Sequence, residues 1–352
     1  MSGAPMWRRM MTNCVIRPWE DNSVNRRSLL LGAALGLAPG LLREAAAQPK
    51  NPAWPRALNM GTAAPGGTYA LYGPAWGQLV QEATGVNISY RTTQGPNQNI
   101  VLVNTREVEI GMVTMGVALQ AWNGDGAWTQ GRKFQDIRAL FPMYDTPFHG
   151  IALKKSGITR MSQLAGKNIG VGPRGGTPGT YFAPMLEKLG YKPGAVRYGS
   201  GADMSGQLQD GLLDAFLFAS GVPIPAFSEA ETQGEVTFLD FTAEEVAKLT
   251  AAYPELSAGT LPASTYRTAG RELRVVGMFN FAIGHKSLPE DLVYEMVKSV
   301  LGQNAKLRQA IAAASETLAE NATKNGFLPY HPGAARYLRE VGQKIPDNLV
   351  MA

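Results

Sequence analysis

Hydrophobic residues recur along residues 56–352 in two alternating patterns. Short apolar runs that end at glycine or proline predict β-strands, whereas apolar pairs spaced three to four positions apart predict amphipathic helices. Strands are expected at residues 57–60, 86–92, 109–114, 137–144, 149–153, 167–172, 195–198, 214–218 and 275–284. Helices are expected after residue 69 and at residues 98–104, 182–189, 203–209, 243–252 and 290–301, followed by a helical C-terminal part with a break at residues 329–333.

Local signals indicate where several of these helices begin. Pro74 has no backbone N–H, so the first helix is expected to become regular near that residue. Asn97 can cap the helix that follows it. The segments 242–245 and 287–290 both have the spacing of a capping box, in which a hydroxyl and a carboxylate satisfy the first backbone N–H groups of a helix.

The alternation of strands and helices predicts an α/β fold with parallel sheets. A strand, a glycine-rich loop and a helix occur twice, which predicts two α/β lobes. We expect residues 56–146 plus 286–352 in the first lobe, residues 147–285 in the second, and a flexible tail at residues 48–55. Parallel sheets bind ligands at the carboxyl ends of their strands, and clefts form between domains, so a ligand cleft is expected between the lobes.

Residues 1–47 have the features of a secretory signal. Arg26 and Arg27 precede an uncharged apolar stretch at 29–42, and three alanines at 45–47 offer a cleavage site. As a helix this stretch is too short to cross a hydrocarbon core of about 30 Å. The arginine pair suggests the twin-arginine route, with an ordinary Sec signal as the alternative. We therefore expect a periplasmic protein that is cleaved near Ala47.

Part of the chain's positive charge lies in this leader. Six of the 33 Lys+Arg and three of the 28 Asp+Glu fall in residues 1–47, so the remainder carries a formal charge of +2, against +5 for the whole chain. That near neutrality gives no support for electrostatic binding to nucleic acid. The single cysteine, Cys14, also lies in the leader, so the remainder has no disulfide or thiolate metal site.

Two glycine-rich loops are candidate anion sites. The loop at residues 61–69 precedes a helix, so its backbone N–H groups can bind an anion, although its glycines can equally serve only a tight turn. Residues 170–175 match the G-x-G-x-x-G dinucleotide fingerprint, but no acidic residue for a ribose follows about 20 positions later. We interpret this second loop as an anion loop in which Arg174 either clamps a carboxylate or is a solvated loop residue.

The remaining chemistry-bearing residues do not indicate catalysis. His149, His285 and His331 have neither H-x-x-x-H nor H-E-x-x-H spacing, so no metal site is expected. We interpret His149 as a structural residue, with a ligand contact as the alternative. No G-x-S-x-G nucleophile elbow occurs. We therefore expect neither an enzyme nor a bound cofactor.

A series of landmarks resembles the TAXI family, the substrate-binding receptors associated with TRAP transporters. They are residues 66–69 (GGTY), 95–99 (GPNQN), 108–113 (VEIGMV), 156–158 (SGI), 164–172 (LAGKNIGVG), 208–216 (LQDGLLDAF), 221–223 (GVP) and 261–266 (LPASTY). Their order and spacing carry the resemblance over nearly all of residues 56–340. The chain departs from the family at Pro96, where a serine is usual, and in the run at 176–180.

The resemblance implies a type II periplasmic-binding-protein fold, with two α/β lobes and a central ligand cleft. It also implies a monomeric receptor that closes on a small carboxylate and delivers it to the membrane subunits of a TRAP-type transporter. The ligand-binding residues expected on this basis are Gly67, Thr68, Tyr69, Asn99, Met115, Arg174, Gly175, Gly176, Thr177, Phe218 and Gly221. The alternatives are an exported nucleotide-dependent oxidoreductase and a sensory receptor that presents its ligand to a kinase.

Overall fold

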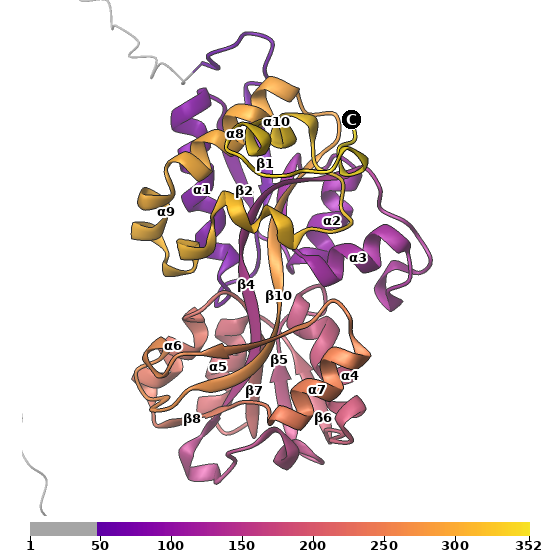
Figure 1. The fold of residues 1–352 in the computed structure, drawn as a ribbon. Helices are drawn as coiled ribbons and strands as arrows, with labels where there is room; N and C mark the ends of the chain where they lie inside the picture. The colour runs from indigo at the N-terminus through magenta and orange to yellow at the C-terminus, as the bar shows by residue number, and fades with distance from the viewer. Residues whose placement is uncertain (1–47) are drawn as a thin grey trace, which may run out of the picture. The chain divides into compact units, whose positions relative to one another are not determined.

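The computed structural model describes residues 48–352, so the expected signal peptide lies outside the described residues. The described chain forms two α/β lobes joined by two long strands (Figure 1). The first lobe contains β1 (Ala57–Gly61), α1 (Tyr69–Thr84), β2 (Asn87–Arg91), α2 (Pro96–Asn104), β3 (Ile110–Thr114), α3 (Met115–Asn123), α8 (Glu290–Gly302), α9 (Asn304–Ala310) and α10 (Pro332–Glu340).

The second lobe contains β5 (Asn168–Val171), α4 (Thr177–Leu189), β6 (Ala195–Tyr198), α5 (Gly201–Gln209), β7 (Ala215–Ala219), α6 (Pro225–Gln233), β8 (Val236–Leu239), α7 (Ala243–Ala252) and β9 (Ser257–Leu261). The joining strands are β4 (Ile137–Leu153) and β10 (Leu273–His285). The C-terminal helices return to the first lobe, where α8 packs against α1 and α10.

One mixed sheet runs through both lobes. Its strand order is β2-β1-β3-β10-β4-β7-β5-β6, with β8 paired to β4 and β9 paired to β10. The pairs β1–β2, β1–β3, β5–β6 and β5–β7 are parallel, whereas β4 and β10 are antiparallel to their neighbours. The helices that follow the parallel strands begin at the carboxyl ends of those strands, on the side of each lobe that faces the other lobe (Figure 1).

The pairing of β4 with β10 is irregular where these strands pass between the lobes. Phe279 lies opposite Asp145, but Phe281 lies opposite Pro142, so β4 contains an extra residue at this point. Such a bulge turns side chains away from the regular alternation of a strand. Asn280 of β10 lies between these two pairs and is fully buried.

Several expected elements differ in extent. The strands expected at residues 137–144 and 149–153 form the single strand β4. The first helix begins at Tyr69 and includes Pro74, because burial of Tyr69 and Tyr72 in its first turn stabilises that turn despite the missing N–H. Helix α2 is capped by Gly95 and already includes Asn97, so the expected asparagine cap is wrong.

The two expected capping boxes have different outcomes. In α7 the hydroxyl of Thr242 accepts from the Glu245 N–H, and the Glu245 carboxylate accepts from the Thr242 N–H, as predicted. The box expected at residues 287–290 is wrong, because α8 is preceded by Pro289 and has no side-chain cap. Ser287 instead pairs its hydroxyl with Nδ1 of His285.

The segment at residues 48–55, which we expected to be flexible, contacts the first lobe. The Lys50 N–H donates to the Thr84 carbonyl, and the Asn51 amide donates to Asp291. Trp54 is buried against the hydrophobic core. This apolar contact and these hydrogen bonds hold a segment whose polar composition resembles that of a linker.

Candidate functional site

A small cavity lies between the two lobes, beside the crossing strands. Its volume is about 40 Å³ in this conformation. It is lined by Ala63, Ala64, Gly67, Thr68, Tyr69, Gln94, Gly95, Pro96, Thr114, Thr146, Pro173, Gly176, Thr177, Pro178, Gly201, Phe218, Ala219, Ser220 and Asn280. Both glycine-rich loops therefore contribute to the same cavity, one from each lobe.

The lobes are hydrogen-bonded to each other around this cavity. The Thr68 N–H donates to Oγ of Ser220 at 2.9 Å, and the Thr68 hydroxyl donates to the Gly221 carbonyl at 2.6 Å. On another side, Oγ1 of Thr114 and Oγ1 of Thr177 are 2.9 Å apart. These direct contacts between the lobes define a closed conformation.

The backbones of the two lobes also touch at glycines. The Asn97 N–H donates to the Gly175 carbonyl, and the Gly175 N–H donates to Oε1 of Gln94. At a second contact, a Cβ on Gly201 would lie 3.0–3.1 Å from the backbone C, Cα and O of Gly66. Gly66 itself has a φ of 89°, which favours glycine. Glycines at these two positions thus allow the backbones of the two lobes to approach each other closely.

Five helices begin at the cavity. The lining includes Thr68 and Tyr69 at the start of α1, Gly95 and Pro96 at α2, Thr114 at α3, Gly176, Thr177 and Pro178 at α4, and Gly201 at α5. A helix N-terminus carries about half a positive charge and unsatisfied N–H groups, and each favours a nearby anion by about 0.3–2 kcal/mol.

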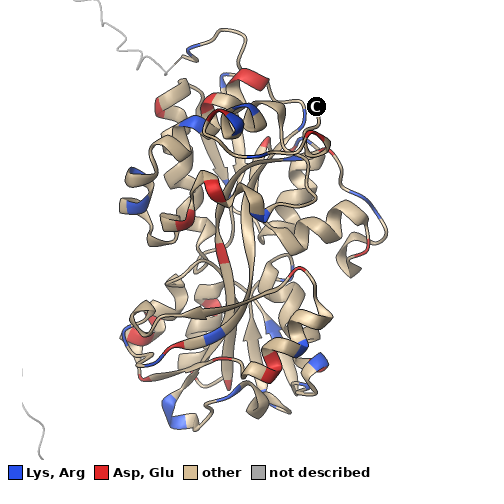
Figure 2. Cartoon of the chain, viewed as in Figure 1, with Lys and Arg blue, Asp and Glu red and all other residues tan. Residues whose placement is uncertain are grey.

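No charged side chain lines the cavity in the described part of the chain. Lysines, arginines and acidic residues are spread over both lobes, and Figure 2 also shows an acidic position on a crossing strand between them. The electrostatic character of the cavity therefore comes from backbone dipoles and hydroxyl groups. This arrangement suits a small anion, which the helix N-termini would stabilise without a counter-ion.

A buried polar cluster forms the floor of the cavity at the bulge. The Tyr69 hydroxyl donates to Oδ1 of Asn280 at 2.5 Å, and Nδ2 of Asn280 donates to the Tyr144 carbonyl and to Oγ1 of Thr146, both at 2.6 Å. Burial raises the pKa of Tyr69 well above its ordinary value, so this hydroxyl remains a neutral donor. Asn280 thus links α1 to both crossing strands.

The structure brings six of the eleven expected ligand-binding residues to the cavity. These are Gly67, Thr68, Tyr69, Gly176, Thr177 and Phe218. Two others, Gly175 and Gly221, do not line the cavity but form hydrogen bonds beside it. The Gly221 carbonyl accepts from Thr68, and the Gly175 backbone pairs with Gln94 and Asn97.

The other three expected residues lie away from the cavity lining. Asn99 is fully buried and donates to the carbonyls of Thr62 and Met112. Met115 is buried in the core. The guanidinium of Arg174 stacks on the ring of Tyr198, 3.8 Å from its centroid. Arg174 is therefore engaged in a cation–π contact and does not line the cavity in this conformation.

Sequence reasoning missed Asn280, Thr146, Thr114, Gln94 and Ser220. An asparagine within the apolar strand segment at 275–284 was a usable signal, because a buried amide needs hydrogen-bond partners. The hydroxyl residues gave no comparable signal. Their position depends on strands and helices that are distant in the chain.

The dinucleotide-like glycines and His149 have structural roles. Gly170 faces the side chains of Leu213 and Met204, and Gly172 faces Pro178 and Phe218, so both permit close packing behind the loop. His149 is completely buried, with Nε2 2.8 Å from the Tyr266 hydroxyl. Burial lowers the pKa of His149 to about 4. It does not line the cavity.

Within residues 48–352, no helix is both long and apolar enough to span a bilayer. The same residues contain no cluster of three or more His, Cys, Asp or Glu side chains arranged to hold a metal ion.

Comparison with known proteins places the fold. The model of the NMT1-like family matches residues 60–342. The periplasmic binding protein BugD shares 14% identity over 82% of this chain and 97% of its own, with a TM-score of 0.54. The arginine-, lysine- and histidine-binding protein ArtJ of Geobacillus stearothermophilus shares 12% identity over 76% of this chain and 100% of its own, with a TM-score of 0.47. The expected type II periplasmic-binding-protein fold is confirmed.

Proposed function

The chain belongs to the NMT1-like family, and from its fold and its cavity we propose that it is an exported receptor that closes on a small anion. The observation that carries the proposal is the convergence of five helix N-termini from both lobes on one cavity without a charged side chain. The mechanism is binding coupled to hinge closure, and no bond is made or broken.

A carboxylate is the anion that we propose for this cavity. Its two oxygens can accept from backbone N–H groups at the start of α1 in one lobe and α4 in the other. The hydroxyls of Thr114 and Thr177 line the same cavity and offer further polar contacts. Because the closed cavity is far smaller than the about 300–1,000 Å³ of drug-sized sites, the ligand is a compact molecule.

Closure between the lobes explains why a ligand would stabilise this conformation. A ligand that contacts both helix sets adds to the bonds between Thr68 and Ser220 and between Thr114 and Thr177. Opening the lobes would break these bonds and the ligand contacts together. The ligand therefore shifts the equilibrium by its differential affinity for the closed form.

A thermal-shift screen of mono- and dicarboxylates and amino acids tests the proposal. A ligand present at about 100 times its Kd should stabilise the folded protein by about 2.7 kcal/mol, and should raise its Tm accordingly. Mass spectrometry of small molecules that co-purify with the protein would identify the natural ligand. A complete screen without any rise in Tm would contradict the proposal.

We further propose that the receptor delivers its ligand to the membrane subunits of a TRAP-type transporter. The ordered landmarks that resemble TAXI receptors support this partner. Co-purification of the liganded receptor with membrane subunits encoded beside its gene would test it. Retention by subunits of an ABC-type transporter instead would replace this partner and leave the ligand proposal intact.

A further inference from the structure

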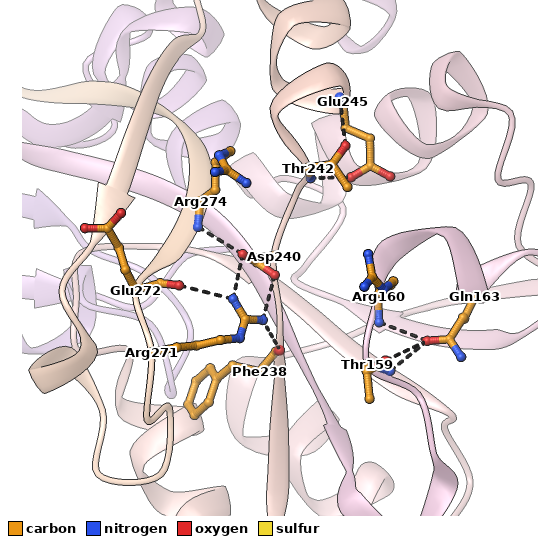
Figure 3. Close-up of polar contacts among 10 residues, drawn as sticks. All are labelled: Thr159, Arg160, Gln163, Phe238, Asp240, Thr242, Glu245, Arg271, Glu272 and Arg274. Atoms are coloured by element: carbon orange, nitrogen blue, oxygen red, sulfur yellow. Dashed lines mark hydrogen bonds and ion pairs between the residues drawn. The ribbon is translucent and has the colours of Figure 1, made fainter.

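A second pocket lies in the second lobe, remote from the cavity between the lobes. Its volume is about 420 Å³, and three separate chain segments line it (Figure 3). They are Thr159 and Arg160, then Thr237, Asp240, Phe241, Thr242 and Glu245, and finally Arg271 and Arg274. We call this set the arginine pocket.

The two carboxylates of the arginine pocket are already engaged. Asp240 accepts two hydrogen bonds from Arg271, at 2.7 and 2.8 Å, and a third from the Arg274 N–H. Although burial opposes the effect, the hydrogen bond from Arg271 lowers the pKa of Asp240, so this carboxyl is ionised. Glu245 accepts from the Thr242 N–H and from the Tyr191 hydroxyl.

Two guanidinium groups remain available. Within residues 48–352, the guanidiniums of Arg160 and Arg274 form no hydrogen bond and no ion pair, and both residues are exposed. Figure 3 shows them on opposite sides of the turn that contains Asp240 and Thr242. The Arg271–Asp240 pair fixes this turn between them, since a bidentate pair restricts both side chains.

The lining indicates the kind of partner. Phe241 is the single apolar residue among those that line the pocket, and it is 1% exposed. Small-molecule sites are mainly enclosed by apolar walls, which this pocket lacks. Exposed arginines around an open polar pocket are instead typical of protein interfaces, where they pair with carboxylates of the partner.

We propose that the arginine pocket docks an acidic segment of a partner protein, with carboxylate side chains pairing with Arg160 and Arg274. All of the lining residues belong to the second lobe and its crossing strands. The docking surface therefore keeps its shape whether the lobes are open or closed. This inference does not depend on which ligand the cavity binds.

Fluorescence anisotropy with a labelled hexaglutamate peptide tests the docking surface. The purified protein should bind this peptide at low ionic strength, and the affinity should fall as salt is added. The double variant Arg160→Gln/Arg274→Gln should bind about tenfold more weakly or worse. The matched control is Arg56→Gln/Arg197→Gln, which removes the same charge at exposed positions outside the pocket and should bind like the wild type.

Three results would overturn the proposal. They are the absence of peptide binding, equal losses in the test and control variants, and displacement of the peptide by inorganic phosphate at micromolar concentration. The last result would make the pocket a small-anion site. Each variant should keep the Tm and the carboxylate response of the wild type, so a failure here is distinct from a failure of the cavity proposal.

Discussion

Gly201 permits a direct test of lobe closure, because its neighbours across the cavity are backbone atoms. In Gly201→Ala, the new Cβ would lie 3.0–3.1 Å from three backbone atoms of Gly66 in the other lobe. The three atoms nearest to this Cβ all belong to Gly66. The substitution should therefore obstruct closure without disturbing the fold of the second lobe.

The expected size of the effect follows from the overlap. Carbon atoms pack best at about 3.5–4.0 Å, and forcing an extra methyl group into a packed contact costs about 1–3 kcal/mol. If closed binding requires this contact, the affinity for the carboxylate found by screening should fall about 5- to 150-fold. Isothermal titration calorimetry would measure the Kd. With ligand present, small-angle X-ray scattering should give a larger radius of gyration for Gly201→Ala than for the wild type.

Gly206→Ala is the matched control in the same helix. Beyond the chain neighbours and the backbone of its own helix, no atom lies within 4 Å of the position of its Cβ, so this variant should bind like the wild type. Alanine is also the better helix former, so Gly206→Ala should be at least as stable as the wild type in urea. Wild-type affinity and compactness in Gly201→Ala would refute the reasoning.

Three further perturbations concern the crossing strands and the lobe contact. Asn280→Leu removes the partners of Tyr69 and of the Tyr144 carbonyl, and should lower the free energy of unfolding by about 2–4 kcal/mol in urea titrations; an unchanged value would show that the cluster adds no stability. Burial, followed by the charge of Glu316, raises the pKa of Asp145 to about 6, so wild-type stability should fall as pH rises from about 4 to 6 relative to Asp145→Asn. The free energy of unfolding of Asp145→Asn, relative to that of the wild type, should rise with pH by at most about 1.4 kcal/mol per pH unit and level off above about pH 6. A difference in stability that does not change with pH would contradict this prediction. A double-mutant cycle of Thr114→Val and Thr177→Val on ligand affinity should give a coupling of about 0.5–1.5 kcal/mol, whereas additive effects would mean that their hydroxyls do not pair on closure.

The strand and helix order could be predicted because the buried runs are short and end at glycines. Strands β1, β3 and β5 lie within one or two residues of the expected ranges. The interruption predicted at residues 145–148 did not occur, since β10 pairs with β4 through that region. A long-range strand partner thus overrode a local composition that is typical of a turn.

The candidate site could be predicted only where backbone chemistry determines it. The loops around Gly67 and Gly176 line the cavity because a glycine loop before a helix presents N–H groups wherever the fold directs it. Arg174 was selected for its charge, but no sequence pattern indicates that Tyr198 would stack on its guanidinium. Asn280 depends on a bulge in the strand that lies opposite, which periodicity cannot show.

The continuous sheet has a consequence for how this protein unfolds. Strand β10 pairs with β9 at one end and with β3 at the other, and β4 pairs with it along most of its length. Neither lobe can therefore be cut out as an autonomous piece without removing a central strand from the other. Denaturation should be a single cooperative transition, and a gene fragment that encodes one lobe should yield an insoluble product.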